Sequence, residues 1–120
     1  MIKVVVADSH PIIHKGIKAC FKNSTEISIT GKALVPDDLF DILDRKMVDI
    51  IILELDLQKS DGLAVLRRIK NEHPGVRVLI FSNQPEEVYA ISSLKAGASG
   101  YLNKKVNPTA IRHAILKIAS

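Results

Sequence analysis

Short apolar segments alternate with amphipathic ones along the whole chain. Five segments rich in Val, Ile and Leu predict strands, at 2–7, 27–34, 48–55, 76–81 and 101–102. The segments that follow them repeat apolar residues at helical spacing and predict helices, at 11–22, 36–46, 61–72, 85–96 and 107–119. Four of the five prolines (Pro11, Pro36, Pro85 and Pro108) stand where a helix should begin, a position that tolerates a missing N–H.

This strict alternation determines the fold class. Strands that alternate with helices form a parallel sheet with helices on both faces, because a parallel crossover needs a helix. The apolar run Ile50–Leu53 is typical of a strand buried on both faces. We therefore expect an α/β fold with a doubly wound, five-stranded parallel sheet, in a single domain over residues 1–120.

Two helical segments carry less certain patterns. The helix over 11–22 places Ile13, Ile17, Cys20 and Phe21 on one face, and we expect Cys20 to be a small core residue. The helix over 85–96 has only a weak apolar stripe, formed by Val88, Ile91 and Leu94. Such a stripe fits a loosely packed element at a movable interface, and it equally fits a merely marginal helix.

Composition narrows the class of protein. Apolar residues make up 47% and charged residues 25%, the balance of a globular chain. The longest apolar run is far too short for a membrane span, and no signal peptide precedes it, so we expect a cytoplasmic protein without a membrane partner. The single cysteine excludes an internal disulfide framework. The net charge of +4 is concentrated in residues 61–120, which fits either an anionic partner or solvated helix surfaces.

Polar residues gather where the predicted strands end. Ligands of a doubly wound sheet bind beyond the carboxyl ends of its strands. The residues at these ends are Asp8, Ser9, Glu54, Asp56, Ser82 and Lys104. A role in capping the following helix would be enough to explain the serine at position 9. It does not explain Glu54, which directly follows four apolar strand residues and needs a cationic partner, for which Lys104 is the natural candidate.

Four segments carry a family resemblance that covers the whole chain. They are VVVADSHPIIHKGI (4–17), VDIIILELDLQKSDGLAVLRRIK (48–70), VLIFSNQ (78–84) and LKAGASGYLNKK (94–105). In this order and spacing they resemble the receiver (CheY-like) domain of a two-component response regulator of the NarL/FixJ class. The resemblance implies the strand order 2-1-3-4-5. It also implies a phosphorelay in which a sensor histidine kinase phosphorylates a strand-end aspartate beside a bound Mg²⁺.

The resemblance assigns roles to individual residues. Asp8 matches the first member of the family's acidic pair, whereas Ser9 replaces the second member. Glu54 occupies the phosphoacceptor position, because the acceptor stands seven residues before an Asp-Gly and Glu54 has that interval to Asp61. Asp56 occupies the position whose backbone carbonyl meets the metal, and completes the acidic pocket.

The remaining family positions lie after the third and fourth strands, and within and after the fifth. Ser82 and Tyr101 match the residues that couple a hydroxyl movement to rotation of an aromatic ring, although Tyr101 could equally be an edge-strand residue with its hydroxyl in water. Lys104 matches the phosphate-pocket lysine. Gln58 stands where the family pattern has proline.

The departures at positions 9 and 54 predict altered chemistry. The residues left to meet Mg²⁺ are Asp8, Glu54 and Asp56, and a serine hydroxyl is a poor ligand for this hard cation, so we expect weak or absent Mg²⁺ binding and no other cofactor. Glu54 extends one methylene farther than an aspartate. We expect impaired phosphotransfer, with Glu54 paired to Lys104 as a fixed substitute for phosphorylation. An alternative is that Asp56 has become the acceptor.

We therefore expect a non-enzymatic, atypical receiver domain. The resemblance implies a transcription regulator whose helix-turn-helix domain is missing from these residues, with DNA bound only through that domain. It also implies a homodimer, formed either through the last helix and strand or through the first and fifth helices. One alternative is a stand-alone adaptor that binds a protein through residues 85–119. Another is a small-ligand enzyme of flavodoxin-like fold, although Asp8–Pro11 has no glycine to cradle a nucleotide.

Overall fold

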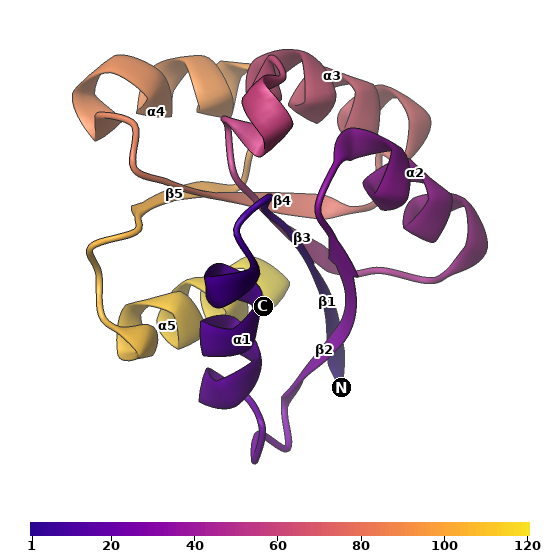
Figure 1. The fold of residues 1–120 in the computed structure, drawn as a ribbon, viewed down its shortest axis with the longest axis vertical. Helices are drawn as coiled ribbons and strands as arrows, with labels where there is room; N and C mark the ends of the chain where they lie inside the picture. The colour runs from indigo at the N-terminus through magenta and orange to yellow at the C-terminus, as the bar shows by residue number, and fades with distance from the viewer.

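A computed structural model describes residues 1–120 as one five-stranded parallel sheet in the order β2-β1-β3-β4-β5 (Figure 1). This confirms the expected doubly wound fold. The strands are β1 (Ile2–Ala7), β2 (Ile27–Ala33), β3 (Ile50–Leu53), β4 (Arg77–Ser82) and β5 (Gly100–Asn103). The helices are α1 (Pro11–Cys20), α2 (Pro36–Arg45), α3 (Gly62–Glu72), α4 (Glu86–Lys95) and α5 (Pro108–Ala119), with a short 3₁₀ turn, η1, at Leu57–Lys59.

Helices cover both faces of the sheet. Helices α2, α3 and α4 lie on one face, and α1 and α5 lie on the other (Figure 1). The side chains of each strand alternate between two apolar cores, so that Ile51 and Leu53 of β3 pack under α2 and α3 while Ile50 and Ile52 pack under α1 and α5. Burial on both faces explains why the β3 segment is apolar throughout.

The element boundaries follow local chemistry. Pro11, Pro36 and Pro108 each lie in the first turn of a helix, as predicted. Asp61 caps α3 by accepting hydrogen bonds from the backbone N–H groups of two residues in its first turn. Strand β3 is shorter than the predicted 48–55, so Glu54 is the first residue beyond the strand.

Cys20 is exposed, which contradicts the prediction of a core residue. The predicted residues Ile17 and Phe21 are buried, and His14 is buried beside them. His14 replaces an apolar residue on this face because its Nε2 lies 2.6 Å from the backbone carbonyl oxygen of Asp8. Ile13 also packs against this core, so the predicted face of α1 is right except at Cys20.

The turn after β3 has an unusual backbone. Gln58 and Lys59 adopt φ angles of 49° and 56°, in the left-handed region that non-glycine residues rarely occupy. Proline, with φ fixed near −65°, cannot adopt the conformation of Gln58. A proline at position 58, as in the family pattern, would therefore require a different backbone conformation in this turn.

Helix α3 begins in direct contact with this turn. A Cβ atom at Gly62 would lie 2.1 Å from the carbonyl oxygen of Leu55, so only glycine fits at the start of the helix. The contact holds the chain on either side of η1 together. It also fixes the backbone immediately after Glu54.

Candidate functional site

The candidate site lies at the carboxyl edge of the sheet. Asp8, Glu54 and Lys104 are the first residues beyond β1, β3 and β5. Backbone hydrogen bonds hold these positions in line with the sheet, because the Glu54 N–H donates to the Ala7 carbonyl at 3.0 Å and the Lys104 N–H donates to the Ser82 carbonyl at 3.1 Å. The three charged side chains therefore start from a rigid frame.

The side chains of Asp8, Glu54 and Lys104 form an ion triad. The Lys104 Nζ lies 2.6 Å from Asp8 Oδ2 and 2.9 Å from Glu54 Oε1. The side chains are almost inaccessible, with exposed fractions of 7% for Lys104, 2% for Asp8 and 6% for Glu54. The expected Glu54–Lys104 pair is thus present. The shorter bond from Lys104 to Asp8 was not predicted from the sequence.

The other two carboxylate oxygens of the ion triad also have protein partners. Asp8 Oδ1 accepts a hydrogen bond from the His10 N–H at 2.8 Å and lies 2.9 Å from His10 Nδ1. Glu54 Oε2 accepts a hydrogen bond from the Asp56 N–H at 3.1 Å. All four oxygens therefore meet a nitrogen of this chain.

The ion triad has a formal charge of −1, because one ammonium offsets two carboxylates. Burial by itself lowers the pKa of Lys104, but the hydrogen bonds and negative charges of Asp8 and Glu54 outweigh this effect and raise it above its ordinary value. Lys104 thus stays charged at neutral pH and neutralises half of the acidic charge.

The arrangement does not fit a magnesium ion. Mg²⁺ requires oxygen ligands in near-octahedral geometry. Here the Lys104 ammonium bridges the two carboxylates, and the other oxygens accept from N–H groups. Asp56 is exposed and contributes its backbone N–H, not its carboxylate, to Glu54. No group of three or more His, Cys, Asp and Glu side chains converges on a common point in the chain.

Ser82 and Tyr101 both contact the backbone of Gln84. The Ser82 hydroxyl, which is fully buried, accepts from the Gln84 N–H at 3.2 Å, and the Tyr101 hydroxyl donates to the Gln84 carbonyl at 2.8 Å. Partial burial raises the pKa of Tyr101. The Tyr101 hydroxyl is therefore held by the β4–α4 loop, and the two residues tie that loop to β4 and β5.

The rings of His10 and His14, which are four residues apart, both contact Asp8. The His10 ring contacts the Asp8 carboxylate, and the His14 ring contacts the Asp8 backbone carbonyl. The two rings serve different atoms of one residue rather than a shared metal. The i, i+4 spacing alone could not have indicated this role.

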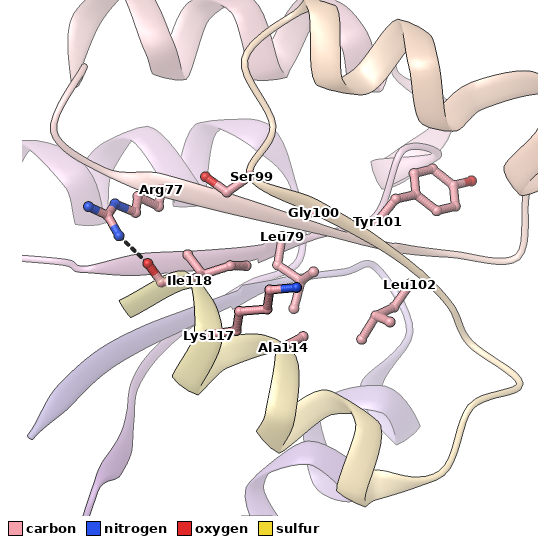
Figure 2. Close-up of a pocket in the computed structure, with 9 residues that line it drawn as sticks. All are labelled: Arg77, Leu79, Ser99, Gly100, Tyr101, Leu102, Ala114, Lys117 and Ile118. Atoms are coloured by element: carbon pink, nitrogen blue, oxygen red, sulfur yellow. Dashed lines mark hydrogen bonds between the residues drawn. The ribbon is translucent and has the colours of Figure 1, made fainter. Parts of the chain in front are cut away.

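A separate hollow of about 380 Å³ lies between β5 and α5 (Figure 2). Leu79, Leu102 and Ala114 are among its apolar lining residues, and Lys117 lies across it. At its margin Arg77 donates a hydrogen bond to the Ile118 carbonyl and so ties β4 to the last turn of α5. The ion triad does not line this hollow.

A doubly wound sheet of this order, with acids beyond β1 and β3, a serine at the end of β4 and a lysine beyond β5, defines the CheY-like receiver class. Residues 4–116 match the family described as "Response regulator receiver domain". The chain belongs to this family, and it is a receiver domain of the LuxR/NarL-like type.

Known relatives and solved structures agree with this assignment. The Fimbriae Z protein of Escherichia coli (strain K12) is 35% identical over 117 residues, which cover 98% of this chain and 56% of the relative. The signal receiver domain of the putative response regulator NarL from Mycobacterium tuberculosis superposes with a TM-score of 0.89 at 26% identity, covering 98% of this chain and 95% of that one. A LuxR-family response regulator from Aurantimonas sp. SI85-9A1 gives 0.90 at 25% identity, covering 98% and 84%.

The chain spans about half the length of the curated relatives it matches. Receiver domains of response regulators are in general non-enzymatic signalling domains, and those of NarL-type regulators typically interact with histidine kinases. No helix in this structure combines the length and the apolar character that crossing a bilayer demands.

Proposed function

We propose that this chain is an atypical receiver domain whose output state is held by the ion triad instead of by phosphorylation. It serves a LuxR/NarL-like regulator that binds DNA through a part outside these residues. The observation that supports this most directly is the engagement of all four carboxylate oxygens of Asp8 and Glu54 by nitrogens of the chain.

Phosphoryl transfer needs an acceptor oxygen that is free, in line with the donor and next to a metal. In the ion triad, Glu54 Oε1 is bonded to Lys104 and Oε2 to the Asp56 N–H. Transfer to either oxygen of Glu54 would first require its hydrogen bond to Lys104 or to the Asp56 N–H to break. This cost supports an acceptor position that does not turn over.

The alternative acceptor, Asp56, has less support. Its side chain is exposed, and the lysine that would neutralise a phosphoryl group is engaged by Asp8 and Glu54. An acyl phosphate at Asp56 would form at an exposed position, while the Lys104 ammonium is engaged elsewhere. Geometry thus favours Glu54 as a permanent anion over Asp56 as a new acceptor.

Glu54 and Lys104 resemble the anion and lysine of a phosphorylated receiver only in part. The carboxylate carries one negative charge, whereas a phosphoryl group carries about 1.5 to 2. Asp8 supplies a second contact to the same ammonium. The chain therefore holds one fixed arrangement, and a histidine kinase that bound it would regulate it by contact rather than by transfer.

A stand-alone adaptor is a second candidate, because helix α4 exposes an apolar face that a partner protein could cover. The length of the full gene distinguishes the two. A helix-turn-helix region after residue 120 supports the transcription regulator, and a stop codon there supports the adaptor.

The phosphorylation test uses acetyl phosphate and Mg²⁺ with intact-mass measurement. We expect no adduct of about 80 Da, the mass of one phosphoryl group, on the unaltered chain. The variant Ser9→Asp/Glu54→Asp should gain the adduct, because it restores both acids, while each single variant should gain little. A stoichiometric adduct on the unaltered chain would overturn the proposal, and its location at Asp56 would establish the alternative acceptor.

A further inference from the structure

The hollow between β5 and α5 has the size and the lining of a small-molecule site (Figure 2). Its volume of about 380 Å³ lies at the lower end of the range of about 300–1,000 Å³ that such sites span. The aliphatic side chains that line it are Leu79, Leu102, Ala114 and Ile118. The ring of Tyr101 points away from it, toward the β4–α4 loop. The hollow therefore offers an aliphatic surface, without an aromatic ring on which a flat ligand could stack.

Gly100 keeps the hollow open where it meets the sheet. A Cβ atom at this position would lie 3.2 Å from Leu79 Cδ1 and 3.6 Å from Ile118 Cδ1, and both of these residues line the hollow. A side chain at position 100 would therefore occupy the space between the sheet and α5. Because glycine has no side chain, that space is left for a ligand.

The charged side chains around the hollow are all positive. Lys117 extends across it from α5, and Arg77 stands at its margin (Figure 2). No Asp or Glu lines the hollow. Arg77 is engaged by the Ile118 carbonyl, whereas Lys117 takes part in no ion pair of the structure. The hollow is therefore complementary to a ligand with an apolar body and one negative charge, and Lys117 is the free cation that would meet this charge.

We propose that the hollow binds a free aliphatic monocarboxylate. The carboxylate accepts hydrogen bonds from the Lys117 ammonium, and the hydrocarbon chain lies against Leu79, Leu102 and Ala114. A chain of about eight to ten carbons suits a hollow of this size. This inference is independent of the proposed function, since no residue of the ion triad lines the hollow.

The character of the two contacts sets the affinity. Lys117 is exposed, so its pairing with the carboxylate adds only a modest preference for an anion. The aliphatic contact should dominate, and each methylene added to the ligand should tighten binding about fourfold until the hollow is full. We therefore expect weak binding, with a dissociation constant of the order of 100 µM for decanoate.

Titration with decanoate, followed by amide NMR spectra of the 120-residue chain, tests the inference. We expect saturable shifts confined to β5 and the last two turns of α5, over a range of about 10 µM to about 2 mM ligand. Decanamide, which has the same chain without the charge, should bind about three- to fivefold more weakly. Shifts centred on α4 or spread over the whole surface would overturn the inference, as would equal affinity for the two ligands.

The same spectra distinguish a small ligand from a second copy of the chain. Without ligand, the amides around the hollow should not shift when the chain is concentrated to about 1 mM. Shifts of these amides on concentration would show that a second copy covers the hollow, and would overturn the inference.

Filling the hollow should abolish binding. Ala114→Leu should weaken decanoate binding at least about tenfold, because the larger side chain occupies the space of the ligand. Ala110→Leu is the matched control, since Ala110 lies one turn earlier on α5 and does not line the hollow. It should leave binding unchanged. Unchanged binding in Ala114→Leu, with the amide spectrum of a folded chain, would exclude the hollow as the site.

Removal of the charge tests Lys117 without disturbing the core, because this side chain is exposed. Lys117→Gln should weaken decanoate binding about three- to fivefold and leave decanamide binding unchanged. Lys105→Gln removes the same charge from an exposed position outside the lining and should alter neither ligand. Equal losses of decanoate binding in the two variants would show attraction by net charge alone and overturn the assignment of the carboxylate to Lys117.

Discussion

The carboxyl edge of the sheet and helix α4 differ in how fully their groups are partnered. At the edge, the ion triad is buried and each carboxylate oxygen has a nitrogen donor. In α4, the apolar stripe lies in solvent, and the buried Ser93 hydroxyl has no partner. The charged groups of the carboxyl edge thus find all their partners within the chain. Helix α4 has an uncovered apolar stripe and a buried hydroxyl without a hydrogen-bond partner.

This difference concerns two regions that a receiver domain normally links. In the family, chemistry at the strand ends alters a surface elsewhere on the domain. Here the carboxylates at the strand ends are bound by nitrogens of the chain, while α4 buries Ser93 and leaves its apolar stripe in solvent. The bonds from Ser82 and Tyr101 to Gln84 still connect the two regions. These hydrogen bonds through the β4–α4 loop therefore join the carboxyl edge to the start of α4.

Removing the Lys104 ammonium from the ion triad should cause the largest loss of stability. Lys104→Met leaves two buried carboxylates without their shared cation, and the loss should be about 3–5 kcal/mol of unfolding free energy. Lys105→Met is the matched control at an exposed neighbouring position and should change stability by less than about 0.5 kcal/mol. Urea denaturation measures both. Equal effects from the two variants would mean that the ion triad contributes no special stability.

Alkaline pH should lower the stability of the unaltered chain, because it removes the charge of Lys104. The folded-state pKa of Lys104 is raised, so its stabilising contribution is complete below the ordinary lysine pKa of about 10.4 and is lost as the pH rises through the higher folded-state value. Tyr101 has a raised pKa as well and adds a loss of the same sign. Thermal unfolding from pH 8 to pH 12 should therefore show falling stability above about pH 10.

Two variants separate these contributions. Lys104→Met and Tyr101→Phe should each flatten the alkaline fall, because each removes one of the titrating groups. An alkaline fall that stays the same in Lys104→Met would show that the ion triad does not contribute to it.

The smallest effects should come from replacing two fully buried serines by alanine. One replacement should lower the free energy of unfolding and the other should raise it. Ser82→Ala removes the acceptor of the Gln84 N–H bond and should cost about 1 kcal/mol. Ser93→Ala removes a hydroxyl without a partner and should raise stability by up to about 1 kcal/mol. Chemical denaturation of both, with the exposed Ser92→Ala as reference, measures the difference. A loss at both positions would indicate that α4 is as tightly partnered as the edge.

The sequence predicted the fold and part of the site for physical reasons. Period and proline placement located the helices and strands, and a carboxylate behind four apolar residues had to find a cation, which identified the Glu54–Lys104 pair. The bond from Lys104 to Asp8 was missed, because its existence depends on how far the ammonium extends across the edge. Local pattern carries no information on that distance.

The direction in which the helix faces point could not be predicted fully from the sequence. Periodicity gives the angle between residues around a helix but not which side faces the core when polar residues can also be buried. In α1, His14 is buried through a bond to a backbone carbonyl, whereas Cys20, expected in the core, is exposed. In α4 the same ambiguity hid the outward direction of the apolar stripe.

The left-handed backbone at Gln58 bears on how segments could be exchanged between this chain and an ordinary receiver. A lone proline introduced there would meet a φ of 49° that its ring forbids. A chimaera that carries the relative's proline must therefore take the whole turn from Asp56 to Ser60 as one block. Replacing a single residue of this turn with its counterpart from a relative would disturb the backbone, whereas replacing the whole turn would not.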